Sequence, residues 1–103
     1  MAVQVGILTV WLRLHGAGSL KDKRKVVRSI LDQTRRAFRC SASETDLHDH
    51  HTQAELTFAV VGGDALALRA LLDRMLEYVE ARCIRHGAEL TDQASDVDRW
   101  QNA

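Results

Sequence analysis

The chain of 103 residues lacks proline entirely and has only two cysteines and few aromatic residues. Without proline there is no proline-rich linker, and no repeat or low-complexity segment divides the chain. Cys40 and Cys83 are too few for a disulfide framework and too far apart for a Cys-x-x-Cys metal site, so we expect reduced, mostly buried thiols in the cytoplasm. The longest apolar run is far below the length that crosses a bilayer, which argues against a membrane protein.

The N-terminal sequence MAVQVGILTVWLRL has no basic segment before its apolar part and no small-residue cleavage site, so we expect no secretory signal. Apolar residues at 46% and charged residues at 27% are typical of a soluble globular protein. The length predicts a single domain, residues 1–103, with its core at about 3–95 and an uncertain tail at 96–103. It leaves no room for a second, cofactor-binding lobe, and we expect no cofactor.

The net charge of zero conceals a segregation of charge along the chain. Between Ser19 and Arg39 there are eight basic residues and two acidic ones, whereas from Cys40 onward there are twelve acids and five arginines. The balance argues against a generally basic nucleic-acid binder. It places a cationic segment on an otherwise acidic protein.

The hydrophobic pattern predicts four strands and two helices. A long strand at 4–14 is followed by a glycine-containing turn, and Ser19 is a suitable N-cap for a helix over 20–38, with Asp22 three residues later. Residues 39–45 alternate weakly before a polar turn, and 53–63 alternate strongly, which indicates a hairpin. Asp64 opens a second helix that Gly87 ends, and a weak final strand follows at 88–92.

This order of elements is the split βαβ arrangement. It predicts an α+β, ferredoxin-like βαββαβ fold with a four-stranded antiparallel sheet and both helices on one face. In the first strand, both alternating sets of side chains are apolar, as if neither face met water. We therefore expect a homodimer through the helix-free face, with Val5, Ile7 and Trp11 as candidate interface residues. The alternative is a bulge or twist that buries different faces at the two ends of the strand.

The first helix carries the candidate nucleic-acid site. At 100° per residue, Lys21, Arg24, Arg28, Arg35 and Arg39 fall within about 60° of one another, beside the apolar side of the helix. Such a row suits a phosphate backbone, and the free N–H groups of the first turn add to its attraction for anions. The candidate residues are Lys21, Lys23, Arg24, Lys25, Arg28 and Arg35.

Lys23 differs from the others because it projects into the apolar side, where its ammonium needs a carboxylate or the sheet edge as a partner. The other interpretations of the basic row are a solvated face, a face paired with the acidic second helix of the same or a neighbouring chain, and a site for another anion. If RNA binds there and four phosphates are neutralised, a plot of the logarithm of the binding constant against the logarithm of the salt concentration should have a slope of roughly −3 to −4.

No enzyme class finds support in the pattern. There is no nucleophile with an evident base, no pair of carboxylates in an apolar setting and no Walker A sequence in GAGSLK. His15 and His86 flank glycine turns without an identifiable partner. The segment QAELTFAV also lacks the basic and aromatic pattern of an RNA-recognition motif, so base stacking on the sheet is not expected. We predict a non-enzymatic protein.

The stretch ETDLHDHH places His48, His50 and His51 close together. On an extended strand His48 and His50 share one side and His51 points to the other, although a tight turn can gather all three. A zinc site needs several ligands held rigidly, which loop tips rarely provide. A solvated hairpin tip, weak adventitious metal affinity and a functional metal site are the three interpretations, and we assign no metal.

The segment SLKDKRKVVRS at Ser19–Ser29, the preceding LHGAG and the later AELTFAVVGGD resemble the YlxP-like family of small bacterial proteins (domain of unknown function 503). The resemblance covers Val5 to about Val79. It implies a ferredoxin-like fold, and the frequent location of family genes beside those of translation-initiation and ribosome-assembly factors implies an RNA-linked role. Members commonly have a tryptophan where this chain has His51, so the histidine cluster is a local departure. No activity comes with the family.

Two hypotheses follow from the sequence. The first is a small accessory protein that binds RNA or the ribosome through the basic helix. The second is a dimeric protein-interaction module whose basic helix docks on an acidic protein surface.

Overall fold

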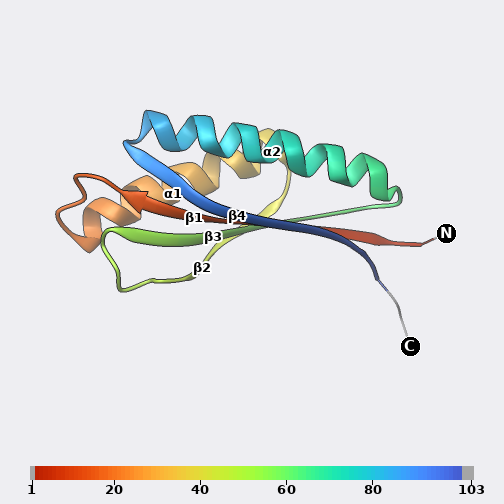
Figure 1. Ribbon diagram of the computed structural model, residues 1–103, viewed down its shortest axis with the longest axis horizontal. Helices are drawn as coiled ribbons and strands as arrows, with labels where there is room; N and C mark the ends of the chain where they lie inside the picture. Colours follow the sequence, from red (N-terminus) through yellow and green to blue (C-terminus); the bar gives the residue numbers. More distant parts are fainter. Residues whose placement is uncertain (1, 101–103) are drawn as a thin grey trace.

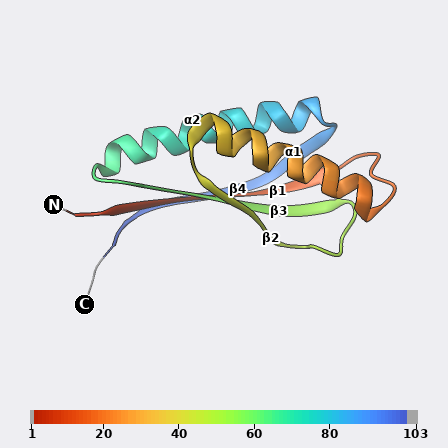
Figure 2. The same cartoon turned by 180° about the vertical axis from the view of Figure 1, so that it is seen from behind.

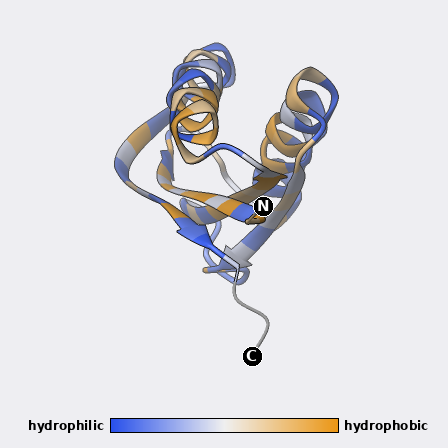
Figure 3. Ribbon diagram, turned by 90° about the vertical axis from the view of Figure 1, so that its right-hand side faces the viewer, coloured by the Kyte–Doolittle hydropathy of each residue, from blue (hydrophilic) through white to orange (hydrophobic). Residues whose placement is uncertain are grey.

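The computed structural model describes residues 2–100 of the chain. The elements follow the predicted order (Figure 1). They are β1 (Gln4–Leu14), α1 (Leu20–Phe38), β2 (Ser41–Asp46), β3 (Gln53–Gly62), α2 (Ala65–Arg85) and β4 (Ala88–Arg99). The strands form one antiparallel sheet in the order β2-β3-β1-β4. Both helices lie on the same face of this sheet (Figure 3), which confirms the ferredoxin-like α+β fold.

The two helices divide the covered face between them. α1 packs along β2, and α2 packs over β1 and β4, so the first helix lies at one edge of the sheet and the second toward the other (Figure 2). No described element covers the opposite face, which we call the open face (Figure 3). Neither helix within residues 2–100 is long and apolar enough to cross a membrane.

The core lies between the sheet and the helices. Alternate residues of β1, beginning at Leu8, and of β3, beginning at Ala54, point inward and are buried. The helices close this layer with apolar side chains at helical spacing, because one residue in every three or four faces the sheet. The members contributed by the helices include Val27, Ile30, Leu72, Met75 and Val79, all of them buried.

The bounds predicted for α1 are confirmed, and its caps explain them. Ser19 has an extended backbone, and its Oγ accepts a hydrogen bond from the N–H of Asp22 at 3.2 Å. At the other end Arg39 adopts the left-handed conformation, with φ of 50°, and its N–H donates to the carbonyl of Arg35. These contacts satisfy backbone groups that a helix end leaves unpaired, and so they fix where the helix starts and stops.

The final strand is longer than predicted. β4 extends to Arg99 and pairs with β1 along its whole length, with an irregularity near Trp11. The predicted uncertain tail therefore begins inside this strand, and only residues 101–103 of it lie outside the described residues. The length of the strand was underestimated because most of its side chains are polar and exposed, so hydrophobic alternation is missing. Backbone pairing with β1 holds β4 in place instead.

Candidate nucleic-acid interface

The exposed side of α1 presents a row of cations that we call the basic ridge: Lys21, Arg24, Lys25 and Arg28. All four residues are exposed. Within residues 2–100, none of the four has a carboxylate within ion-pair distance. At a rise of about 1.5 Å per residue the ridge extends over roughly 10 Å of helix. Its positive charge is therefore available to an anion from solution.

Two hollows flank the ridge, and Arg28 lines both. The first is a groove of about 320 Å³ between α1 and β2, to which Arg24 and Arg35 also contribute, with Glu44 on the strand side. The second, also of about 320 Å³, lies on the other side of Arg28 and is lined by Lys25 and Arg36 among others. A guanidinium beside a concave surface can donate two parallel hydrogen bonds to a phosphate, so Arg28 occupies the central position of this surface.

Arg35, the last predicted member of the site, is already engaged. Its Nη1 lies 2.7 Å from Asp32 Oδ1, and its Nη2 donates to the carbonyl of Ala42 on β2. The guanidinium thus ties α1 to the adjacent strand while its side chain remains 43% exposed. Arg35 extends the groove but offers less free charge than the basic ridge.

Lys23 does not belong to the site, and this corrects the prediction. Its side chain is 1% exposed, and its Nζ lies 2.8 Å from Glu44 Oε2 and donates to the carbonyl of Leu47. A buried ammonium needs such partners because desolvation of an unpaired charge is costly. Lys23 therefore joins α1 to the end of β2 and cannot reach a ligand. The expected partner type, a carboxylate at the sheet, is the one observed.

The first turn of α1 is closed by its own side chains. Ser19 caps the N–H of Asp22, and Asp22 Oδ2 accepts from the N–H of Gly18 at 3.3 Å. The carboxylate of Asp22 offsets the positive end of the helix dipole. The anion attraction expected at this helix start is therefore partly offset within the chain, and the ridge side chains carry the site.

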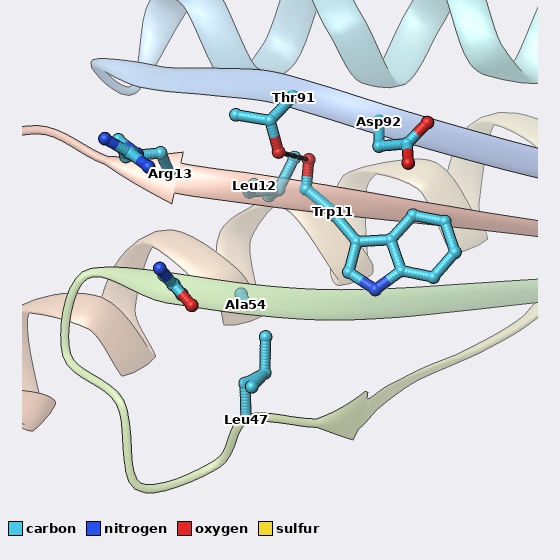
Figure 4. A pocket seen from close by; sticks show the side chains of 8 residues that line it. Trp11, Leu12, Arg13, Leu47, Ala54, Thr91 and Asp92 are labelled. Carbon is cyan, nitrogen blue, oxygen red and sulfur yellow. Dashed lines mark hydrogen bonds between the residues drawn. The ribbon is translucent and has the colours of Figure 1, made fainter.

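The three predicted dimer residues lie on the open face. Val5 is half-buried, Ile7 is 37% exposed, and the indole of Trp11 lies along the sheet, where its Nε1 donates to Glu55 Oε1 at 2.9 Å. A hollow of about 320 Å³ adjoins Trp11, with Leu47 reaching toward it from the β2–β3 loop (Figure 4). The open face thus begins apolar at Val5 and becomes more polar toward Trp11.

The histidine-rich loop does not gather its side chains. His48 Nε2 lies 3.0 Å from the carbonyl of Glu44, and the loop turns back through a hydrogen bond from the N–H of His50 to Leu47. Within residues 2–100, no group of three or more His, Cys, Asp or Glu side chains is placed to hold a metal ion. His15, the other histidine beside the sheet, is exposed and 3.0 Å from Glu89.

A hydrogen-bonded chain that the sequence did not suggest joins the two helices. Ser29 Oγ lies 3.2 Å from His86 Nε2 and accepts from Gln33 Nε2, while Gln33 Oε1 accepts from Arg82 Nη1. The guanidinium of Arg82 also lies 4.8 Å from the ring centre of Tyr78. These contacts hold the helices together behind the second hollow. Ser29 and His86 are 57 positions apart, so only the fold brings them together.

Fold and surface together define a small ferredoxin-like domain with a basic helical ridge and a helix-free sheet face. The chain belongs to the family described as "Protein of unknown function (DUF503)", whose model matches residues 5–94. No curated protein matches the sequence.

Solved structures share the fold at low sequence identity. The chain is similar to protein YJCS, with a TM-score of 0.57 and 10% identity over 89% of this chain and 96% of that one. It is also similar to YXEP of Bacillus subtilis, a dinuclear metal-binding peptidase of the M20 family (TM-score 0.56, 13% identity, 95% and 26% covered). It is similar as well to an amidase of the hydantoinase/carbamoylase family from Burkholderia phymatum, with a TM-score of 0.59 and 10% identity over 97% of this chain and 28% of that one. The chain spans about a quarter of those two enzymes, and these likenesses concern the fold alone.

Proposed function

We propose that this protein is a non-enzymatic accessory protein that binds RNA, on its own or within the ribosome, through the basic ridge of α1. The observation that carries the proposal is the row of four exposed cations, which have no carboxylate partner among residues 2–100 and are set between two hollows that share Arg28. Phosphate contacts by such side chains supply most of the affinity of non-specific nucleic-acid binding.

The arrangement favours recognition of the backbone over recognition of bases. The cations lie on a helix at one edge of the covered face, whereas Trp11 lies on the opposite, open face. One strand of RNA therefore does not contact both surfaces at once. Binding through the ridge proceeds by charge and shape, without the stacked aromatics of an RNA-recognition motif.

Charge reversal tests the proposal. In the variant Arg24→Glu/Arg28→Glu the ridge loses two phosphate contacts and gains two repulsive charges. We expect the affinity for a ribosomal RNA fragment to fall by at least about tenfold, and the log–log salt slope to decrease in magnitude by about 2. Binding isotherms over a range of salt concentrations give both quantities, and co-sedimentation with ribosomes provides a second readout.

The matched control is Arg74→Glu/Arg85→Glu on α2, because both arginines are exposed and the change in net charge is the same. Unaltered RNA binding by the ridge variant, or an equal loss in both variants, would refute the proposal. The alternative partner, an acidic protein surface, is tested with polyglutamate as probe. Binding to polyglutamate that depends on Arg24 and Arg28, without measurable binding to RNA, would replace RNA by an acidic protein.

A further inference from the structure

An apolar patch lies at one end of the open face. Its members come from β1, β3 and the residues that flank the sheet: Val3, Val5, Ile7, Ala59, Val61 and Trp100. The pairing explains why they share a face, because Val5 lies opposite Val61 and Ile7 opposite Ala59. The hydrogen bond from the N–H of Trp100 to the carbonyl of Val3 continues the β1–β4 alignment one step further.

The exposure of this patch is large for a small domain. Val3 is 50%, Ile7 37%, Val61 74% and Trp100 62% exposed. With about 150 to 250 Å² per large side chain, these fractions correspond to roughly 400 Å² of apolar surface, which is within the range of the largest patch on a typical monomer, a patch that is often functional. A standard interface buries about 800 Å² per partner, of which somewhat more than half is apolar. The patch supplies most of that apolar share.

The polar part of the open face is already paired within the sheet. Thr57 Oγ1 lies 3.0 Å from Thr9 Oγ1 and 2.9 Å from Thr45 Oγ1, and Thr45 Oγ1 donates to Glu55 Oε2 at 2.6 Å. Glu55 also accepts from Trp11. The threonine hydroxyls keep their hydrogen bonds when a partner covers this row, and the donors Trp11 and Thr45 offset part of the cost of desolvating the Glu55 carboxylate.

The outer strands differ in charge. The side chains of β4 on the open face include Asp92, Asp96 and Asp98, whereas β2 presents Ser41, Ser43 and Thr45 on the same face. A two-fold axis perpendicular to the strands sets β4 against the β4 of a second copy, so that carboxylates oppose carboxylates. An axis parallel to the strands sets β4 against β2, so that the carboxylates of the two β4 strands lie apart and Asp96 lies over the hydroxyl of Ser41. Avoidance of like-charge contact between the two β4 strands favours the second arrangement.

The strand register makes this arrangement self-complementary. Four residues lie in one row across the sheet. Ile7 on β1 pairs with Ala59 on β3 and with Asp96 on β4, and Ala59 pairs in turn with Ser41 on β2. An axis parallel to the strands therefore places Ile7 over Ala59 of the second copy, a large side chain over a small one, and Asp96 over Ser41. Sheets packed face to face are rotated by about 30°, so the match at the outer strands holds to within about one residue.

We propose that two copies of this chain form a dimer through their open faces, about a two-fold axis that lies between the sheets and runs parallel to the strands. The inference goes beyond the proposed RNA binding and is independent of it. Both basic ridges remain on the outer surfaces of the dimer, because α1 lies on the covered face of each sheet. One dimer therefore presents two ridges.

The first test measures the molar mass by light scattering over a dilution series. We expect a species of twice 11.6 kDa for the native chain. Val61→Asp should raise the dissociation constant at least about thirtyfold, as for a central interface residue. Ile84→Asp on α2 is the matched control, because Ile84 is 73% and Val61 74% exposed, and it should leave the dimer intact. Circular dichroism verifies that both variants are folded.

A monomeric native chain at every concentration overturns the proposal, as does a dimer that Val61→Asp leaves unchanged or that Ile84→Asp weakens equally. RNA binding is not measured in this test, so its outcome does not depend on that of the charge reversal.

The second test fixes the axis by cross-linking in a Cys40→Ser background, in which the buried Cys83 is the remaining native thiol. A mixture of the single variants Ser41→Cys and Asp96→Cys should be linked by a short bis-maleimide, whereas neither variant alone should link to itself. Self-linking of Asp96→Cys would establish the perpendicular axis and refute the geometry. Failure of the mixture to link in a dimeric preparation would refute it as well.

Discussion

The buried ion pair between Lys23 and Glu44 allows a quantitative prediction. Lys23→Met keeps the apolar stem but removes the ammonium, which leaves Glu44 Oε2 without its ion-pair partner and the carbonyl of Leu47 without its donor. Loss of one partner of a buried pair costs about 3 to 5 kcal/mol. The side chain of Glu44 is 16% exposed and so retains some contact with water. We therefore expect the lower end of that range, about 3 kcal/mol.

A loss of this size is a large part of the stability of a small domain, which is about 5 to 15 kcal/mol. It corresponds to a fall in Tm of about 10 to 20 °C. Chemical unfolding followed by circular dichroism measures the free energy of unfolding, and an unchanged m-value shows that the variants unfold in the same way. Lys25→Met is the control, because Lys25 is exposed and lies only two residues from Lys23 along α1, and it should change the stability by less than about 0.5 kcal/mol.

A double-mutant cycle isolates the pair itself. Glu44→Met alone leaves the ammonium of Lys23 buried without its carboxylate and should cost at least as much as Lys23→Met. The double variant Lys23→Met/Glu44→Met places two apolar side chains in contact and should recover to within about 1 kcal/mol of the native chain. If Lys23→Met has no measurable effect, or if the two single losses add, then the pair does not stabilise the fold as described.

Two further predictions concern the thiols and a glycine. Burial, with a smaller contribution from Glu80, raises the pKa of Cys83 from 9.0 to about 12. A maleimide at neutral pH should therefore label the folded chain at Cys40 and not at Cys83, as mass spectrometry of the labelled peptides will show. Between pH 9 and 12 the folded state keeps the Cys83 proton while the unfolded state loses it. The free energy of unfolding should therefore fall by up to about 1.4 kcal/mol per pH unit in this range. The same slope in Cys83→Ala would contradict this origin. Gly87 follows α2 with φ of +71°, so Gly87→Ala should cost about 1 to 2 kcal/mol. Gly63→Ala, with open space around its Cβ position, should cost little.

The sequence was sufficient for most of the fold because the local signals agree with the tertiary structure. α1 begins where Ser19 predicts and ends at Phe38, as the hydrophobic period predicts, and β1 has the predicted bounds. The inward projection of Lys23 followed from helical periodicity, but its partner did not, because Glu44 belongs to a strand whose register no local pattern specifies. The contact of Ser29 with His86 was missed because it depends on how two helices distant in the sequence pack against each other.

β4 shows where periodicity carries too little information. Leu90 and Val97 are its only half-buried apolar residues beyond Ala88, so the alternation that identifies a strand is too sparse to follow to Arg99. An edge strand is defined by backbone pairing with its neighbour, and its side chains can remain polar. The same polar side chains give β4 its acidic character, which the segregation of charge along the sequence did indicate.

The positions of α1 and β4 have a consequence for how this neutral molecule meets a charged surface. The cations lie over one edge of the sheet, and Glu89, Asp92, Asp96 and Asp98 line the other, so the domain carries a lateral electric dipole. A polyanion attracts one flank and repels the other, and the torque turns the molecule into the binding orientation before contact is made. Association should therefore slow as salt rises even though the net charge is zero. At neutral pH the protein should also be retarded on both anionic and cationic chromatography resins, in opposite orientations.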